Sequence, residues 1–137
     1  MNGEFSVRKG RHCVSALHAH LVFVTKYRAK VFNGAILERL EAILREVCVD
    51  FEVELTEFNG EEDHIHLLIE YPPKVQISKL INSLKGVSSR LLRKEYSAIH
   101  QYLWKGALWS PSYFAGSCKG ASLEIIANYI ERQNRPS

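Results

Sequence analysis

The chain has 137 residues, of which 46% are hydrophobic and 24% charged, a balance typical of one globular domain. No apolar run approaches the ~18 residues of a membrane-spanning helix, and no continuous apolar segment follows the basic N-terminus as in a signal peptide. The three cysteines are scattered without a C-x-x-C pair, which argues against a disulfide framework or a zinc knuckle. We therefore expect one cytoplasmic domain over residues 1–137, with residues 1–13 as a loose arm.

Charge is unevenly distributed along the chain. Residues 1–73 carry 8 Lys and Arg against 12 Asp and Glu, a net charge of −4, whereas residues 74–137 carry 10 against 3, a net charge of +7. A basic half can attract a polyanion such as nucleic acid. A solvated basic surface without a partner is the alternative, and charge alone does not choose between them.

The first half of the chain predicts a strand, a helix and a hairpin. Residues 16–27 (ALHAHLVFVTKY) are rich in β-branched and aromatic residues and predict a strand, and helical apolar spacing follows Gly34. Residues 51–58 (FEVELTEF) begin with the strict alternation of a half-buried strand. Asn59-Gly60 predicts the turn into a second strand over residues 63–71 (DHIHLLIEY), which ends at a pair of prolines.

The second half predicts a long helix, a strand and a final helix. Residues 75–96 have a helical apolar stripe, and Gly86 within it indicates close packing or an approach of DNA. Residues 109–118 (WSPSYFAGSC) predict an edge strand because of the proline near its start, and residues 122–133 predict a helix. The order indicates an α+β, ferredoxin-like split β-α-β fold: an antiparallel sheet with both long helices on one face, plus a C-terminal helix.

His64 and His66 form the first candidate site. Side chains two apart on a strand share a face, so the two imidazoles project together while Ile65 and Leu67 point to the core. Two neutral ring nitrogens on a face away from the core can hold one divalent metal ion. An ordinary pair of surface histidines is the alternative, because the H-x-H pattern is short and common.

The second candidate group is Tyr129 and Gln133, one turn apart on the final helix. Helical geometry places both on one flank of the stripe formed by Leu123, Ile126, Ala127 and Ile130, which makes Tyr129 a border residue. A phenol can act as a nucleophile, and an amide oxygen can bind a metal ion. A tyrosine packing at the edge of the stripe is the alternative. If the tyrosine serves the histidines, this helix must reach the sheet face opposite the long helices, from this subunit or from a second one.

Five segments in order resemble one family across nearly the whole chain. They are HLVFVTKYRAKVF, DHIHLLIEYPP, LKGVSSR, LWSPSYF and NYIERQ. Together they resemble the single-tyrosine HUH transposases of bacterial and archaeal insertion sequences (the insertion sequence 200/605 group), in which HUH denotes His-hydrophobic-His. One departure is W-S-P where W-N-P is expected, which makes Ser110 a poor site candidate.

The resemblance implies roles for the matching positions. His64, His66 and Gln133 would bind Mg²⁺ or Mn²⁺, and Tyr129 would be the nucleophile that forms a 5′-phosphotyrosine with single-stranded DNA next to a hairpin. It also implies a homodimer in which the histidines of one subunit face the tyrosine helix of the other, although the residues alone leave an arrangement within one subunit open. We expect DNA contacts from basic and aromatic residues of the first strand's end and of the basic half: Lys26, Tyr27, Arg28, Lys85, Arg90, Arg93, Lys94 and Lys105.

Three alternatives remain at this point. A domesticated palindrome-associated tyrosine transposase would have the same chemistry and different DNA ends. A non-catalytic ferredoxin-like binding module would show no metal dependence. A metal-dependent phosphohydrolase would release free DNA ends without a covalent intermediate.

Overall fold

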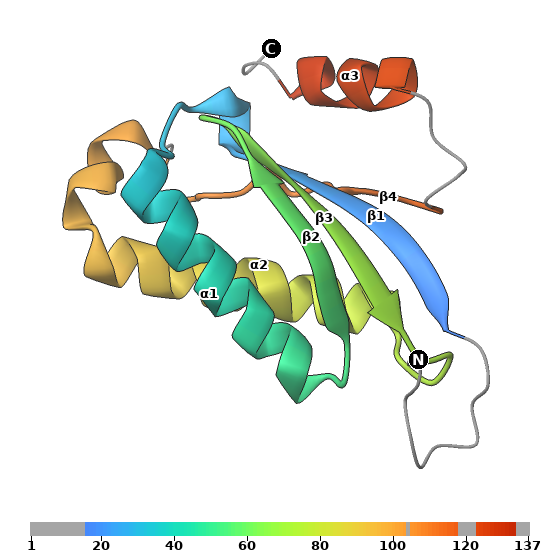
Figure 1. Ribbon diagram of the computed structural model, residues 1–137. Helices are drawn as coiled ribbons and strands as arrows, with labels where there is room; N and C mark the ends of the chain where they lie inside the picture. Colours follow the sequence, from blue (N-terminus) through green and yellow to red (C-terminus); the bar gives the residue numbers. More distant parts are fainter. Residues whose placement is uncertain (1–15, 104, 118–122, 134–137) are drawn as a thin grey trace.

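The computed structural model describes residues 16–103, 105–117 and 123–133 (Figure 1). The predicted arm over residues 1–13 lies outside these ranges, as do Cys13 and Cys118. The described part contains three α-helices, two 3-10 helices and one four-stranded sheet. Their bounds are β1 (Leu17–Val24), η1 (Lys26–Arg28), α1 (Gly34–Asp50), β2 (Glu54–Gly60), β3 (His64–Tyr71), α2 (Ile77–Glu95), η2 (Ser97–Tyr102), β4 (Phe114–Gly116) and α3 (Leu123–Arg132). None of the described helices is long and apolar enough to cross a membrane.

The sheet has the strand order β2-β3-β1-β4, and every pairing is antiparallel. Helices α1 and α2 cover one face, and α3 lies on the other (Figure 1). The predicted α+β fold with a ferredoxin-like split β-α-β order is therefore confirmed.

Both faces of β1 are buried over its C-terminal half, where this central strand lies between the two helix layers. Leu21 and Phe23 point into the main core with α1 and α2, and Val22 and Val24 point the other way into a smaller cluster with α3. All four side chains are fully buried. The smaller cluster is important for function because it determines where α3 docks.

The hairpin turn lies later than the predicted Asn59-Gly60. Both of these residues are still paired with β3, and the turn is closed by a hydrogen bond from Glu61 N to His64 O at 2.8 Å. The glycine is explained by packing, because a Cβ at Gly60 would lie 2.5 Å from Cδ2 of Leu37 in α1. The turn itself is held by tertiary contacts, since Glu62 O accepts hydrogen bonds from two backbone amides that precede α1.

Three predicted strands are longer than those in the structure. The strand predicted over residues 16–27 ends at Val24, because Lys26–Arg28 forms the 3-10 helix η1. The segment over residues 51–58 forms a strand only from Glu54, because Phe51 caps α1 and Glu52 adopts a left-handed φ of 62° that ends the helix. The segment over residues 109–118 pairs fully only at Phe114–Gly116, with Trp109 in an isolated bridge to Thr25, because Pro111 interrupts the ladder. The prediction that this strand forms an edge is confirmed.

Gly86 is exposed on α2, and a Cβ placed there would meet no heavy atom of the described residues within 4 Å. Close packing against the described part of the chain is therefore not the reason for this glycine. The other interpretation, an approach of DNA, remains a prediction.

Ser88 of α2 anchors the segment that leads into β4. The serine is fully buried, and its hydroxyl accepts the indole Nε1–H of Trp109 at 3.0 Å. We expect Ser88→Ala to lower the free energy of unfolding by about 1–3 kcal/mol, because the buried indole N–H would lose its acceptor. Urea unfolding measures this loss, with the exposed Asn82→Ala on the same helix as a control expected to change by less than about 0.5 kcal/mol. Equal stabilities for the two variants would contradict the assignment.

Candidate active site

His64 and His66 lie on the face of β3 that points away from α1 and α2. Their ring centroids are 5.1 Å apart, while the intervening Ile65 is fully buried in the main core. The predicted sharing of one face is therefore confirmed. Each ring also has a hydrogen bond at Nδ1: His64 donates to Asp63 Oδ1 at 2.7 Å, and His66 lies 3.2 Å from His20 Nε2. The Nε2 lone pair of His64 is therefore left for a metal ion, and that of His66 is left for it in the tautomer in which His66 Nδ1 donates to His20 Nε2.

The local environment favours neutral imidazoles. Burial, aided by the neighbouring charges of His64 and His20, lowers the pKa of His66 to about 4. Burial also lowers the pKa of His20. A metal ion binds the neutral ring through a lone pair, so His66 is available as a ligand at neutral pH without losing a proton.

His20 was missed by the sequence analysis. It lies on β1 directly opposite Leu68, and its ring centroid is 5.4 Å from that of His66. The alternation of side chains along a strand could have revealed it. His18 and His20 in the sequence H-A-H lie on one face of β1, the same face as Val22, the partner of His66. The ring of Phe114 on β4 lies 6.2 Å further along, and that of Tyr129 on α3 another 6.1 Å. A continuous row of rings therefore joins the histidines to the tyrosine helix.

Tyr129 occupies the docked face of α3. It is only 7% exposed and packs with Ile126 against Val22 and Val24 of β1. The predicted border position is wrong: Ile126, Tyr129 and Ile130 form the docked face, and Ala127 is exposed. The predicted apolar stripe included Ala127 in place of Tyr129, because the sequence could not show how α3 packs on the second face of the sheet.

The register of β1 and β3 relates Tyr129 to the histidines. Val22 pairs with His66, and Val24 pairs with His64. The two side chains that support Tyr129 are thus the cross-strand neighbours of the two histidines. The helix reaches this face within one subunit, which is one of the two arrangements that the sequence left open.

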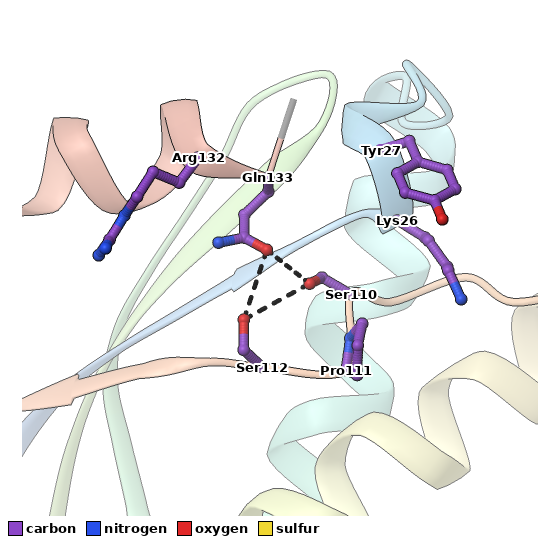
Figure 2. Close-up of a pocket in the computed structure, with 7 residues that line it drawn as sticks. All are labelled: Lys26, Tyr27, Ser110, Pro111, Ser112, Arg132 and Gln133. Atoms are coloured by element: carbon purple, nitrogen blue, oxygen red, sulfur yellow. Dashed lines mark hydrogen bonds between the residues drawn. The ribbon is translucent and has the colours of Figure 1, made fainter. Parts of the chain in front are cut away.

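Gln133 and two serines form a hydrogen-bonded group beside Tyr129 (Figure 2). Gln133 Oε1 accepts from Ser110 Oγ at 2.7 Å and from Ser112 Oγ at 3.4 Å, and Gln133 Nε2 donates to Tyr129 O at 3.2 Å. Ser112 Oγ also lies 2.8 Å from Tyr129 Oη. Ser110, which the sequence analysis set aside, therefore contacts a predicted site residue, and Ser112 was missed. The sequence contains no pattern that would show these serines, on either side of Pro111, to lie close to Tyr129 and Gln133 in the fold.

Gln133 and the two serines line a pocket of about 270 Å³, and Tyr129 is joined to it through its contact with Ser112. Lys26 and Tyr27 from η1 lie on one side of it, and Gln133 with the serines lies on the other (Figure 2). Burial raises the pKa of the Tyr129 phenol, and the Ser112 hydrogen bond and the charge of Arg132 oppose that shift. The phenol therefore remains protonated at neutral pH until a further positive charge or a proton acceptor approaches.

The candidate DNA contacts fall into two classes. Three cationic side chains donate hydrogen bonds within the protein. Arg28 Nε donates to Asp63 Oδ2 at 3.0 Å, and Lys85 Nζ donates to the carbonyls of Ser110 at 2.8 Å and Ser112 at 3.0 Å. Arg93 Nε donates to Ser89 O at 3.1 Å and to Ser89 Oγ at 3.2 Å. Burial lowers the pKa of Lys85 to about 8, so it remains charged at neutral pH. The other candidates lie at the surface or line the pocket: Lys26, Tyr27, Arg90, Lys94 and Lys105.

The donor chemistry of the histidine pair fits a divalent metal ion. Within residues 16–103, 105–117 and 123–133, no cluster of three or more His, Cys, Asp or Glu could hold one. A third protein ligand from the described residues would therefore be a donor other than a His, Cys, Asp or Glu side chain, such as the amide oxygen of Gln133. In this structure that oxygen is hydrogen-bonded to the two serines instead.

Comparison with known proteins gives consistent matches. The family model described as "Transposase IS200 like" matches residues 13–133. The ISDra2 transposase TnpA of Deinococcus radiodurans is 34% identical over 128 residues, which cover 93% of this chain and 91% of that protein. The transposase for insertion sequence element IS200 of Salmonella typhimurium is 32% identical over 114 residues, covering 83% and 74%.

Solved structures agree with these matches. The crystal structure of a candidate transposase from Deinococcus radiodurans R1 has a TM-score of 0.85 at 32% identity, covering 95% of this chain and 100% of that one. A REP-associated tyrosine transposase, solved with a REP hairpin, has a TM-score of 0.58 at 11% identity, covering 92% and 69%, and shares the fold. The family match spans nearly all of the chain, and the relatives above 30% identity are matched over most of their own length. The chain therefore belongs to the family of IS200-like transposases.

Proposed function

We propose that the protein is a single-stranded DNA transposase that cleaves and rejoins strands at hairpin-marked ends through a 5′-phosphotyrosine at Tyr129. The main support is the placement of both candidate groups on one face of the sheet. Tyr129 packs on Val22 and Val24, the cross-strand partners of His66 and His64. Family membership supports the transposase activity, and the geometry supports the assignment of roles within it.

Nε2 of His64, Nε2 of His66 and the amide oxygen of Gln133 would hold Mg²⁺ or Mn²⁺. Such an ion, when bound, polarises a non-bridging phosphate oxygen and offsets the negative charge that develops on it. The chain's own contribution is to hold His66 neutral through burial, and to orient both imidazoles through the hydrogen bonds at their Nδ1 atoms.

Tyr129 would supply the nucleophile. Its phenolic oxygen forms a bond to the scissile phosphorus while the bond from phosphorus to the 3′ oxygen breaks. The phenol loses its proton, and the departing 3′ oxygen gains one. The phosphodiester energy is retained in the tyrosine ester, so a 3′-hydroxyl from another DNA end can reverse the step and join strands without ATP.

The hydrogen bonds around Tyr129 set a requirement for this reaction. Tyr129 Oη and Gln133 Oε1 both contact Ser112, so both must exchange these contacts for the phosphate and the metal ion. Rearrangement within one subunit and exchange of α3 between two subunits would both meet this requirement. We propose the second, a homodimer with composite sites, in accord with the resemblance of the sequence.

A mixing experiment separates the two arrangements. We expect a mixture of the inactive His64→Ala and Tyr129→Phe proteins to regain cleavage, because a mixed dimer with composite sites contains one site with both intact groups. Sites within single subunits would always lack one group, so the mixture would stay inactive. Cleavage of a hairpin-bearing single strand after subunit exchange measures the outcome, and each variant mixed with itself is the control.

DNA recognition would depend on the basic second half and on η1. Lys26 and Tyr27 line the pocket beside Gln133, so they are placed to meet the strand near the scissile phosphate. The basic side chains of α2 and the following loop would contact phosphates of the hairpin stem: Arg90, Arg93, Lys94 and Lys105. Arg28 and Lys85 also remain candidates, although each already has a protein partner.

A covalent-adduct assay tests the proposal as a whole. The protein is incubated with single-stranded hairpin DNA and Mg²⁺, and a DNA adduct that survives denaturation is sought. A metal-dependent phosphohydrolase would release free ends without an adduct, and a non-catalytic module would leave the strand intact. Either of these results would contradict the proposal.

A further inference from the structure

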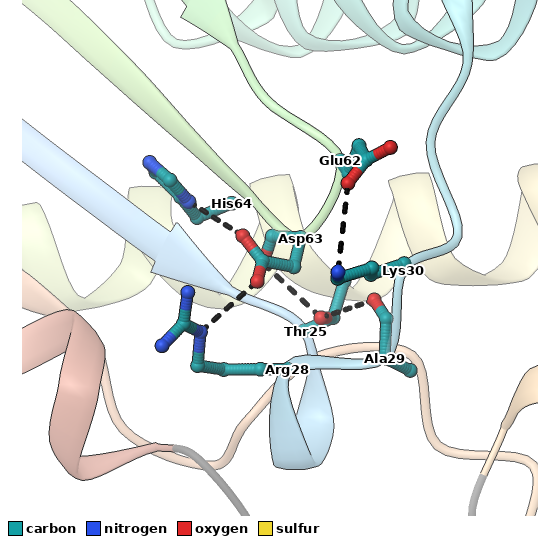
Figure 3. A network of polar contacts seen from close by, with 7 residues as sticks. All are labelled: Thr25, Arg28, Ala29, Lys30, Glu62, Asp63 and His64. Carbon is teal, nitrogen blue, oxygen red and sulfur yellow. Dashed lines mark hydrogen bonds and ion pairs between the residues drawn. The ribbon is translucent and has the colours of Figure 1, made fainter.

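Asp63, the residue before the first histidine, accepts two hydrogen bonds through a buried carboxylate (Figure 3). The residue is 5% exposed. Its Oδ1 accepts Nδ1–H of His64 at 2.7 Å, and its Oδ2 accepts Nε–H of Arg28 at 3.0 Å. One carboxylate therefore joins the hairpin turn, the metal-site candidate His64 and the cation of η1.

The backbone of Asp63 is fixed as well. Its carbonyl oxygen accepts hydrogen bonds from Thr25 N at 2.9 Å and from Thr25 Oγ1 at 3.1 Å, and Thr25 is fully buried. Arg28 has a φ of 56°, a left-handed conformation that is unfavourable for a non-glycine residue. Tertiary contacts must compensate for this cost, and the Asp63 ion pair is one of them. The carboxylate is thus held rigidly on both its backbone and its side-chain side.

This arrangement determines which nitrogen of His64 carries the proton. A neutral imidazole has one N–H and one lone pair, and a carboxylate can only accept. Nδ1 must therefore carry the proton, which leaves the lone pair on Nε2. A metal ion needs that lone pair, and partners of this kind commonly orient ligating histidines.

We propose that Asp63 is a positioning residue that fixes the metal-binding tautomer of His64, and that Arg28 holds the Asp63 carboxylate in place. The proposal rests on the proposed function, since it assigns His64 as a metal ligand. It gives Arg28 a role in the site in addition to any contact with DNA. A purely structural alternative is that the Asp63–Arg28 pair only stabilises the hairpin turn.

Asparagine at position 63 separates these two roles. Its side chain has a single acceptor oxygen, for which Arg28 and His64 would both compete. The charged guanidinium forms the stronger hydrogen bond, so the oxygen should turn to Arg28 and the amide NH₂ to His64. His64 would then accept at Nδ1 and carry its proton on Nε2, where it blocks metal binding.

The experiment uses the full chain as Asp63→Asn, as Arg28→Met/Asp63→Asn and as the control Glu70→Gln. Glu70 is matched to Asp63 because its carboxylate lies 3.8 Å from His18 Nε2 on the same face of the sheet. Long-range ¹H–¹⁵N NMR of the metal-free proteins at about pH 8, above the ordinary histidine pKa of ~6.5, reports the tautomer of His64. Titration with Mn²⁺ alone reports affinity, and thermal unfolding reports stability.

We expect wild-type His64 to be protonated at Nδ1 and Asp63→Asn to be protonated at Nε2, with Mn²⁺ affinity reduced about 10- to 100-fold. The double variant should regain much of both properties, because removing Arg28 frees the asparagine oxygen for His64. Glu70→Gln should match wild type. Recovery by a second substitution that removes an ion-pair partner is not expected of a merely structural role.

Two results would overturn the proposal. One is wild-type His64 protonated at Nε2, which needs no variant and so decides the matter even if Asp63→Asn does not fold. The other is a folded Asp63→Asn protein with the wild-type tautomer and Mn²⁺ affinity. His64→Ala tests separately whether His64 is a metal ligand, as the proposed function assumes. If this variant retains Mn²⁺ binding and cleavage, the proposed function fails. If it loses both, a negative result for Asp63→Asn counts against the role of Asp63 alone.

Discussion

Tyr129→Phe is expected to form no covalent DNA adduct and to lose strand cleavage and joining by about 10⁴-fold or more, as in other enzymes that lose their nucleophile. The substitution removes only the oxygen that would attack phosphorus. The phenylalanine ring can still fill the space between Ile126 and the two valines of β1. Its main local cost is the hydrogen bond to Ser112. Denaturing electrophoresis of labelled hairpin DNA after incubation with Mg²⁺ measures both adduct and cleavage.

Tyr102→Phe is the matched control, because Tyr102 is 53% exposed at the end of η2 and does not belong to the small cluster between α3 and β1. It should retain the wild-type adduct yield. Hairpin binding by Tyr129→Phe should also stay near the wild-type value, which would show that chemistry alone is lost. An adduct formed by Tyr129→Phe in wild-type amount would rule out Tyr129 as the nucleophile.

His66→Ala is expected to reduce cleavage by about 10³-fold or more. A metal ion contributes several kcal/mol to such reactions, and each ~1.4 kcal/mol corresponds to a factor of ten. Burial keeps His66 neutral, so at neutral pH the wild-type ring can act as a ligand at no cost in proton release. A chelator should have the same effect on the wild-type protein, and added Mg²⁺ or Mn²⁺ should reverse it. Initial rates of hairpin-strand cleavage at several metal concentrations measure both effects.

The control for this variant is His18→Ala. His18 is exposed on β1 beside Glu70, so its replacement removes an imidazole from the same face of the sheet without removing a candidate ligand. It should cleave at close to the wild-type rate. Wild-type cleavage by His66→Ala in the presence of Mg²⁺ would refute the metal assignment.

Much of the fold could be predicted from periodicity and order alone. The two long helices and the first strand lie within a few residues of their predicted positions, because their apolar patterns match a single buried face or a buried strand. The errors occur where tertiary contacts override local preference. Gly60 is present for its approach to Leu37, not for a turn, and Pro111 reduces a predicted ten-residue strand to a bridge and Phe114–Gly116.

The candidate site was predictable where strand parity applied and not where it depended on packing between distant segments. Parity placed His64 and His66 together correctly. It could not show that α3 presents Tyr129 as part of its docked face, because that depends on the second apolar face of β1. Contacts such as Ser110 with Gln133, or Arg28 with Asp63, join residues 23 and 35 positions apart, and single-residue propensities contain no information about them.

The small cluster between α3 and β1 also has an energetic consequence. Among residues 124–132 of α3, the part of the helix whose side chains the structure describes, only Ile126 and Tyr129 are buried, with Ile130 partly so. Burial of a large apolar side chain is worth roughly 1.5–3 kcal/mol, so detaching α3 costs only a few kcal/mol, less than a typical global stability of about 5–15 kcal/mol. This small cost would allow α3 to leave its own sheet and dock on that of a second copy, as the proposed homodimer requires. In such a dimer, α3 would occupy its own sheet or the partner's according to the effective concentration at which its connecting segment presents it to each sheet.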